Sequence, residues 1–440
     1  MVKKIGVLLL CFLLWQCKDN DSPPSGLKPK INLVATYGGS GNEVAQSIIT
    51  TNEGGYAVFG YSQSADGDLT GRFGNDFDYW LLKFDSFHNL QWSKTFGGTS
   101  SDKGFDCIQT EDGGFALVGL SESNDGDVSE NFGGNDVWVV KTDNQGNIIW
   151  EVSHGFSGND QGLSLLETSD NQLLIIGVLD VTASGGDGND RFTARHAGGD
   201  YWAIKLDGNG NKIWRRYFGG SFTDTPYGIA PTIDGGFILA GSSDSTDVDV
   251  SENKGNYDYW IVKINANGDL VWERNFGGSQ IDEARSIVRS NDGNYVILGD
   301  SRSNDFDITN PRGAADMWLI KIDDSGNLIW EKSIGGTSFD AGRKILSNTE
   351  GFLLTGSSRS SDLDVSENKG QNDGWIVQVD MNGNLVWQIS CGGSQIDFYY
   401  GITELANGQI VAIGETNSAD GDIDLNRGFT DLLITNIILE

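Results

Sequence analysis

Pairs of aspartates separated by one residue recur along the chain, and their carboxylate oxygens are ligands that a hard cation prefers. Each pair is followed two positions later by Ser, Thr or Asp, so oxygen-bearing side chains alternate as they do in calcium loops. The six loops are therefore candidate calcium sites, with Asx turns in a solvated loop as the alternative. The positions are Asp66/Asp68/Thr70, Asp125/Asp127/Ser129, Asp247/Asp249/Ser251, Asp305/Asp307/Thr309, Asp362/Asp364/Ser366 and Asp420/Asp422/Asp424.

A second series of acids follows a repeated Gly-Gly pair by four residues. One interpretation is a ring of acids around an axial channel that attracts cations. The other, which we prefer because a residue repeated in every unit usually serves the fold, is that each carboxylate caps backbone N–H groups of its own turn. These acids are Glu43, Asp102, Asp160, Asp224, Asp282, Asp340 and Asp397.

The Gly-Gly pairs, of which the third copy is degenerate, mark seven similar units of 57 to 64 residues. Tryptophan supports this register, because every Trp after Trp15 belongs to one of six pairs spaced by twelve positions. Two apolar runs flank a turn within each pair, which predicts a β-hairpin whose two Trp face each other. Because the Trp recur at fixed positions, we expect them to pack between the units rather than to bind sugars.

The unit that begins at Gly97 contains four runs that predict short strands: "DKGFDCIQT", "FALVGLS", "DVWVVKTD" and "NIIWEVSHG". Seven such units predict an all-β fold, a seven-bladed β-propeller of four-stranded antiparallel blades. The last unit ends at "DLLITNIILE" without a fourth strand, and "INLVATYGG" at Ile31–Gly39 can supply it. We therefore expect the N-terminal strand to close the ring by joining the C-terminal blade, which hides both sheet edges.

These motifs, such as "WVVKTDNQGNIIW" at Trp138–Trp150 and "DGGFALVGLS" at Asp112–Ser121, resemble those of a bacterial seven-bladed β-propeller repeat family. The resemblance covers Ile31–Glu440. It is specific for the fold and weak for function, since such repeats often lack a defined activity. The segment around Asn327–Trp330 is also similar, more faintly, to repeats of pyrroloquinoline-quinone dehydrogenases.

The N-terminus carries a targeting segment. Lys3 and Lys4 precede the apolar run Ile5–Trp15, which is too short to span a bilayer as a mature helix. Cys17 and the following "KDND" resemble a lipoprotein signal of the Bacteroidetes surface type, with an ordinary secretory signal as the alternative. We therefore expect a signal peptide at 1–16, a lipidated Cys17 with a polar tether at 17–30, the propeller at 31–440, and a location at the outer membrane or cell surface.

The third unit departs from the others by a longer loop. Its segment Gly185–Thr193 fits a calcium-binding nonapeptide that would use Asp187, Asn189 and Asp190. The same loop places basic residues on an otherwise acidic face, and we expect it to set partner specificity, with a neutral insertion as the alternative. The candidate residues are Arg191, Arg195 and His196.

Composition limits the function. The net charge of -32 argues against nucleic acid and against contact with anionic lipid beyond the anchor. The chain has three His and lacks the common catalytic motifs, so an enzyme is not favoured and no organic cofactor is expected. The sequence favours a surface-anchored, non-enzymatic binding or scaffold protein whose acidic loops meet a surface protein or glycan. The alternative is an extracellular lyase, glycosidase or quinoprotein-like enzyme with its site in the axial funnel.

Overall fold

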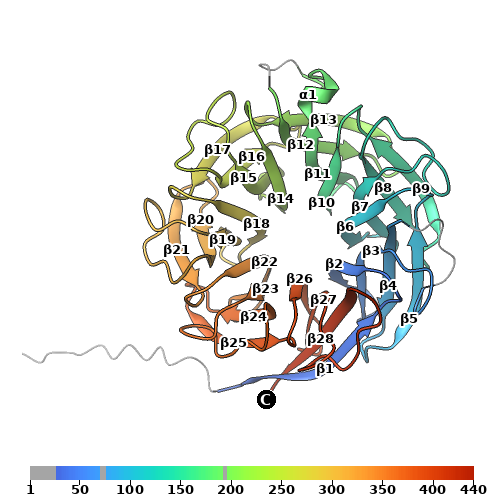
Figure 1. Cartoon of the computed structure of the whole chain (residues 1–440). Coiled ribbons are helices and arrows are strands. Elements are labelled where there is room, and N and C mark those ends of the chain that lie inside the picture. Colours follow the sequence, from blue (N-terminus) through green and yellow to red (C-terminus); the bar gives the residue numbers. More distant parts are fainter. Residues whose placement is uncertain (1–25, 70–75, 192–195) are drawn as a thin grey trace, which may run out of the picture.

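The computed structural model describes residues 26–69, 76–191 and 196–440. These residues form seven four-stranded antiparallel sheets arranged as blades around a central axis (Figure 1). In six of the sheets the strands follow chain order from the axis to the rim, and in the seventh the outer strand comes from the start of the chain. The prediction of a seven-bladed β-propeller is confirmed.

The strands fall into four concentric positions. The innermost are β2 (Glu43–Thr50), β6 (Asp102–Gln109), β10 (Gln161–Glu167), β14 (Asp224–Pro231), β18 (Asp282–Arg289), β22 (Asp340–Ser347) and β26 (Asp397–Glu404). The second are β3 (Tyr56–Ser62), β7 (Phe115–Ser121), β11 (Leu173–Asp180), β15 (Phe237–Ser243), β19 (Tyr295–Ser301), β23 (Phe352–Ser358) and β27 (Ile410–Thr416). The third are β4 (Asp78–Phe84), β8 (Asp136–Thr142), β12 (Gly199–Leu206), β16 (Asp258–Ile264), β20 (Asp316–Ile322), β24 (Asp373–Val379) and β28 (Asp431–Leu439). The outer are β5 (Leu90–Phe96), β9 (Ile148–His154), β13 (Lys212–Phe218), β17 (Leu270–Phe276), β21 (Leu328–Ile334), β25 (Leu385–Cys391) and β1 (Pro29–Tyr37).

We number the blades 1 to 7 from β2 to β26. Blade 7 is completed by the two ends of the chain, because β1 pairs antiparallel with β28. Two bonds between Lys28 and Glu440, each from a backbone N–H to a backbone C=O, extend this pairing to its end. The predicted closure of the ring is confirmed, because β1 from the start of the chain covers the edge of β28 at its end.

The two Trp of a hairpin do not face each other, so that prediction is wrong. Trp80 lies opposite Thr95, and Trp92 lies opposite Lys83 three residues further along β4. An offset of three residues places the rings on opposite faces of the sheet. Trp92 therefore packs against Phe115 of the next blade, in a core that also contains Trp138. This confirms that the Trp pack between blades.

Tyr side chains add hydrogen bonds between the blades. The hydroxyls of Tyr79, Tyr201 and Tyr259 donate to the backbone carbonyls of Trp138, Trp260 and Trp318, at 2.9 to 3.0 Å. Each Tyr is fully buried, and its hydroxyl would cost free energy without such a partner.

Helix is nearly absent from the described residues, where α1 (Val181–Ser184) follows β11 in the long loop of blade 3. Asp180 caps it by accepting a hydrogen bond from the N–H of Ala183 at 2.9 Å. Within the described ranges, no helix has the length and apolar character needed to cross a membrane.

Candidate functional site

The acids that follow the Gly-Gly pairs are buried at the starts of the innermost strands. In blade 2, Asp102 accepts hydrogen bonds from the N–H of Gly98 and from Oγ of Ser123, both at 2.8 Å, and Oγ of Ser121 donates to its other oxygen. These bonds join the turn that enters the blade to the loop after its second strand, and we call this assembly the seam. The seven acids, each 0% exposed, are Glu43, Asp102, Asp160, Asp224, Asp282, Asp340 and Asp397. The contacts are those of turn caps, and burial keeps the carboxylates out of the channel.

The aspartates of the Asp-x-Asp loops accept hydrogen bonds from the backbone of the same Gly-Gly turns. In blade 5, Asp305 accepts a hydrogen bond from the N–H of Ser279 at 2.8 Å, and Asp307 accepts one from the N–H of Gly277 at 3.0 Å. Equivalent bonds are made by Asp66/Asp68, Asp125/Asp127, Asp247/Asp249, Asp362/Asp364 and Asp420/Asp422.

The third position of these loops varies, since Asp424 is exposed and Thr70 lies outside the described residues. Across residues 26–69, 76–191 and 196–440, no group of three or more acidic, His or Cys side chains is arranged to hold a metal ion. Calcium binding stays a prediction.

Basic side chains cross from one blade to the second Asp of the next blade's loop. Lys254 Nζ lies 2.8 Å from Asp307, and Lys369 Nζ lies 2.7 Å from Asp422. The longer pairs are Arg312–Asp364 at 3.5 Å, Arg427–Asp68 at 3.8 Å and His196–Asp249 at 3.7 Å. Among the described residues, a basic side chain from the preceding blade thus reaches five seams.

A second buried carboxylate completes each seam, and the sequence reasoning missed it. It is the first residue of the third strand, except in β12 where it is the second. Its sequence signal is an Asp two positions before the first Trp of each hairpin. Burial raises the pKa of Asp136 and Asp200 to about 7 and that of Asp258 and Asp316 to about 6. The seven are Asp78, Asp136, Asp200, Asp258, Asp316, Asp373 and Asp431, all at most 2% exposed.

His196, predicted to face a partner, is buried in a seam instead. Its Nδ1 lies 2.5 Å from Asp200, and its side chain is fully covered. Burial alone would lower the pKa of His196, but the hydrogen bond and charge of Asp200, with the charges of Asp249 and Asp224, raise it. His196 therefore occupies the place that Lys254 or Lys369 takes in other blades.

The remaining polar groups of the long loop are used within the protein or exposed. Arg191 pairs with Asp269, and Asp190 lies 3.1 Å from Lys212 Nζ. Asn189 accepts a hydrogen bond from the N–H of Arg191 at 3.1 Å, and Asp187 is exposed. Arg195 lies outside the described residues.

The middle residue of each Asp-x-Asp loop has a positive φ. Blades 1, 2 and 7 place Gly there, whereas blades 4, 5 and 6 place Val248, Phe306 and Leu363 at φ of 60°, 51° and 54°. Such side chains in this region cost roughly 1–2 kcal/mol per residue. A Cβ on Gly126 would lie 2.4 Å from the carbonyl oxygen of Gly97.

In each loop the N–H of the second Asp donates a hydrogen bond to the carbonyl oxygen of the first Gly of the Gly-Gly pair. This bond is slightly longer where the middle residue of the loop is not Gly. Its N–H to carbonyl distance is 2.9 to 3.0 Å in blades 1, 2 and 7, and 3.1 to 3.3 Å in blades 4, 5 and 6. The three side chains are 42–66% exposed, so burial does not offset the strain.

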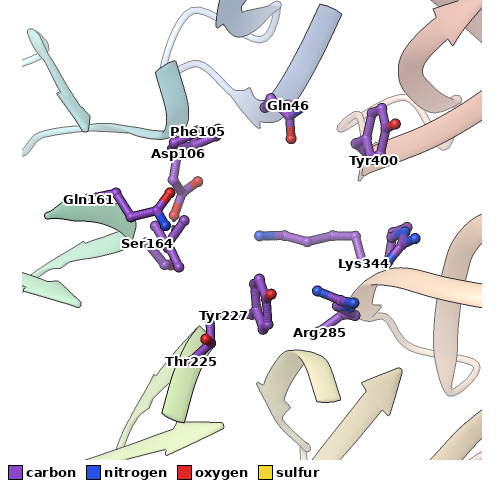
Figure 2. A pocket seen from close by; sticks show the side chains of 12 residues that line it. Gln46, Phe105, Asp106, Gln161, Ser164, Thr225, Tyr227, Arg285, Lys344 and Tyr400 are labelled. Carbon is purple, nitrogen blue, oxygen red and sulfur yellow. Dashed lines mark hydrogen bonds between the residues drawn. The ribbon is translucent and has the colours of Figure 1, made fainter. Parts of the chain in front are cut away.

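A cavity of about 300 Å³ lies on the axis of the ring, where all seven innermost strands contribute to its wall (Figure 2). The wall has aromatic, amide and charged side chains. They are Gln46, Phe105, Asp106, Gln161, Leu163, Ser164, Thr225, Tyr227, Arg285, Arg343, Lys344 and Tyr400. The volume is at the lower end of the range for small-molecule pockets.

A β-bulge in each innermost strand supplies the main row of this wall. In β2 the register shifts between Ala45 and Ser47, so Gln46 has no partner across the sheet, and the other six strands shift at the same place. Bulges re-aim side chains. The bulged residues, one per blade, are Gln46, Phe105, Leu163, Tyr227, Arg285, Arg343 and Tyr400.

The cations of the wall belong to neighbouring strands β18 and β22. Arg285 lies over the ring of Tyr227, 4.3 Å from its centroid, and donates to Glu283 at 2.7 Å. Arg343 and Lys344 make no ion pair within 4 Å among the described residues. Lys344 extends into the cavity from β22 (Figure 2).

Asp106, the acid of the wall, accepts hydrogen bonds from groups of the protein. Asp106 accepts hydrogen bonds from Oγ of Ser47 at 2.7 Å, from Oγ of Ser164 at 2.8 Å and from the N–H of Leu165 at 3.2 Å. It therefore ties three innermost strands together, and its oxygens are satisfied by the protein.

Sequence reasoning named Arg191, Arg195 and His196 as candidates for partner specificity, and it missed the cavity wall. The signal was present three residues after each repeated acid. This position varies among Gln, Phe, Leu, Tyr and Arg, with Arg285 and Arg343 in consecutive blades, whereas the residue three positions earlier is an acid in every blade.

No protein-family model matches the chain. Over 240 residues, 49% of this chain, it is 24% identical to the regulatory protein FlaEY of Caulobacter vibrioides. The match covers 25% of that relative, so the chain spans a small part of its length.

Solved structures with a similar fold have very different sequences. The Pan2 WD40 domain of Neurospora crassa is 8% identical at a TM-score of 0.46, with 92% of this chain and 95% of that chain covered. The aldose sugar dehydrogenase of Streptomyces coelicolor is 8% identical at 0.39, with 95% and 100% covered. The endosialidase of phage phi92 is 10% identical at 0.42, with 92% and 68% covered.

Proposed function

We propose that the protein is a non-enzymatic binding protein, held at the cell surface by a lipid on Cys17, and that its ligand enters the axial cavity. The observation that carries this proposal is the variation of the cavity wall. The seams repeat one design in nearly every blade, whereas the bulged residues differ from blade to blade. Variation on a repeated scaffold is expected where a site needs its own chemistry.

Binding is favoured over catalysis by the state of the acids near the cavity. Hydrolysis of a glycosidic bond needs a carboxyl group that is free to exchange a proton with the substrate. The oxygens of Asp106 accept four hydrogen bonds from the protein, and Glu283 is paired with Arg285. An extracellular enzyme remains the alternative, and product formation would reveal it.

The cavity is tested by filling it. The full-length chain, purified in detergent, is offered a panel of glycans and small metabolites, and binding is measured by calorimetry. Leu163→Trp places a large side chain in the cavity and should abolish binding, whereas Ile213→Trp, on the exposed rim of the same blade, should not. Unchanged binding by Leu163→Trp, or turnover of the bound compound, would contradict the proposal.

The anchor is tested separately in cells. Cys17→Ala should prevent incorporation of a labelled fatty acid and should remove the protein from the surface pool that external protease digests. Labelling that persists in Cys17→Ala would show that the lipid lies elsewhere or that the signal is of another kind.

A further inference from the structure

We infer that the axial cavity takes an acidic saccharide, whose carboxylate is bound by Arg343 and Lys344 and whose ring lies against the aromatic side chains of the wall. This inference rests on the proposed function, because it names the ligand class of the same cavity.

The first argument is the charge that the cavity presents to a ligand. Arg343 and Lys344 are adjacent on β22, and both line the cavity without an ion pair in the described residues. Two partly desolvated cations in one small cavity repel each other, and a bound anion offsets that cost. These two cations stand out because the chain as a whole carries a net charge of -32.

The acids near these cations are engaged by groups of the protein, although Asp106 keeps its negative charge at the wall. Asp106 gives its oxygens to Ser47, Ser164 and Leu165. Asp300 is 2% exposed, and the charge of Arg343 opposes the rise in its pKa that burial causes. Glu415 accepts a hydrogen bond from the hydroxyl of Tyr400 at 2.8 Å. A ligand in the cavity therefore meets donors and positive charge rather than free carboxylates.

The second argument is the geometry of the cations. An Arg guanidinium binds a carboxylate through two parallel hydrogen bonds, while a Lys ammonium adds a point charge beside it. Arg285, fixed over Tyr227 and paired with Glu283, sits on the neighbouring strand and holds that ring in place. Tyr227 is therefore a positioned surface rather than a mobile side chain.

The third argument is the uncharged part of the wall. Phe105, Tyr227 and Tyr400 offer rings to the apolar face of a sugar, and Gln46 and Gln161 offer amides to its hydroxyls. Rings with a few convergent polar groups are typical of small-ligand sites. A cavity of about 300 Å³ has room for one sugar unit or the end of a chain, rather than a long polymer.

The test compares matched sugars on the full-length chain in detergent. The probes are D-glucuronate and D-galacturonate, with D-glucose and D-galactose as neutral partners and inorganic phosphate as a bare anion. We expect an acidic sugar to bind roughly tenfold or more tightly than its neutral partner, because a charge-assisted hydrogen bond contributes that much. The affinity should fall as salt rises. Phosphate alone should bind weakly, since it cannot use the rings.

Variants assign the contacts. Arg343→Gln and Lys344→Gln should each weaken binding of the acidic sugar roughly tenfold, with a shift of the melting temperature of no more than a few degrees. Lys332→Gln, on outer strand β21, is the control and should bind like the wild type. The inference is overturned if no acidic sugar binds, if neutral sugars bind equally well, or if phosphate competes with full strength. If Leu163→Trp abolishes binding of a neutral ligand and Arg343→Gln does not, the cavity is the site and only its assigned chemistry is wrong.

Discussion

The seams and the cavity wall are built by the same innermost strands, yet they follow opposite rules. The first position of β18 is Asp282, which is buried and bonded as its equivalents are in the other blades. Three residues later stands Arg285, whose equivalents are glutamine, phenylalanine, leucine, tyrosine and another arginine. The seven units therefore act as an alignment within one chain. Positions that repeat hold the ring together, and positions that vary are free to bind.

The Asp-x-Asp loops also contain one position that varies, and its residue type separates two groups of neighbouring blades. Gly fills the positive-φ position in blades 1, 2 and 7, and Val248, Phe306 and Leu363 fill it in the consecutive blades 4, 5 and 6. Tyr227, Arg285 and Arg343 of the cavity wall also belong to blades 4, 5 and 6. Three consecutive blades thus differ from the others at these loops, and two of them place the arginines in the wall of the cavity.

The largest effect is expected from removing a seam acid. Asp282→Ala leaves the N–H of Gly278 and the hydroxyls of Ser301 and Ser303 without their acceptor inside the fold. Unsatisfied buried donors cost about 1–3 kcal/mol each, so we expect about 3 kcal/mol or more of lost stability. Chemical denaturation followed by Trp fluorescence measures it.

Arg343→Gln is the matched comparison, because its side chain lines the cavity instead of a seam. It should change stability by less than about 1 kcal/mol. Equal losses in Asp282→Ala and Arg343→Gln would break the distinction between seam and wall.

The second effect is a loss of stability as pH rises. Burial raises the pKa of Asp136 and Asp200 to about 7 and that of Asp316 to about 6. A group whose pKa is raised on folding stabilises the fold below its unfolded pKa, and this stabilisation disappears as pH rises through the folded value. The raised pKa of His196 acts in the same direction. The melting temperature should therefore be several degrees higher at pH 5 than at pH 8.

Asp316→Asn sharpens this test, because it removes one titrating carboxyl from a seam. We expect the variant to have a smaller difference in melting temperature between pH 5 and pH 8 than the wild type. Asp323→Asn, whose carboxylate accepts hydrogen bonds in an exposed hairpin turn of the same blade, should leave that difference unchanged. A wild-type protein that gains stability from pH 5 to pH 8 would show that the buried carboxyls do not govern it.

The sequence predicts the repeated parts of this molecule well and the variable parts poorly. The ring, its closure by β1 and the role of the Trp rows could be predicted, because each depends on residues that recur at a fixed spacing. The prediction that the two Trp of a hairpin face each other was wrong, because periodicity locates a hairpin but not the register of its strands. The bulge after Ala45 could not be foreseen, since a bulge is a property of strand pairing. Without it, Gln46 and its equivalents could not be placed in a cavity, and His196 could not be placed in a seam.

The third effect concerns the loops that differ between the two sectors. Gly126→Val should destabilise the protein by about 1–2 kcal/mol, because it forces a β-branched residue into a left-handed conformation. Val248→Gly should gain up to about 1 kcal/mol, since the relief of strain is partly cancelled by the entropy of Gly in the unfolded chain. Thermal melting of both variants measures the pair. A loss of stability in Val248→Gly would mean that its exposed side chain stabilises the fold in a way that outweighs the strain.

The smallest effect is expected from calcium. The carboxylates of Asp305 and Asp307 already accept backbone hydrogen bonds, and Lys254 contributes a cation at 2.8 Å from Asp307. An ion would have to displace these partners, so we expect melting in calcium and in chelator to differ by less than about 2 °C, since binding stabilises only in proportion to its affinity for the folded state. Lys254→Met removes the competing cation from this seam alone. A calcium-dependent rise of several degrees in the wild type would show that the loops are metal sites after all, and a rise confined to Lys254→Met would show that the lysine takes the place of an ion.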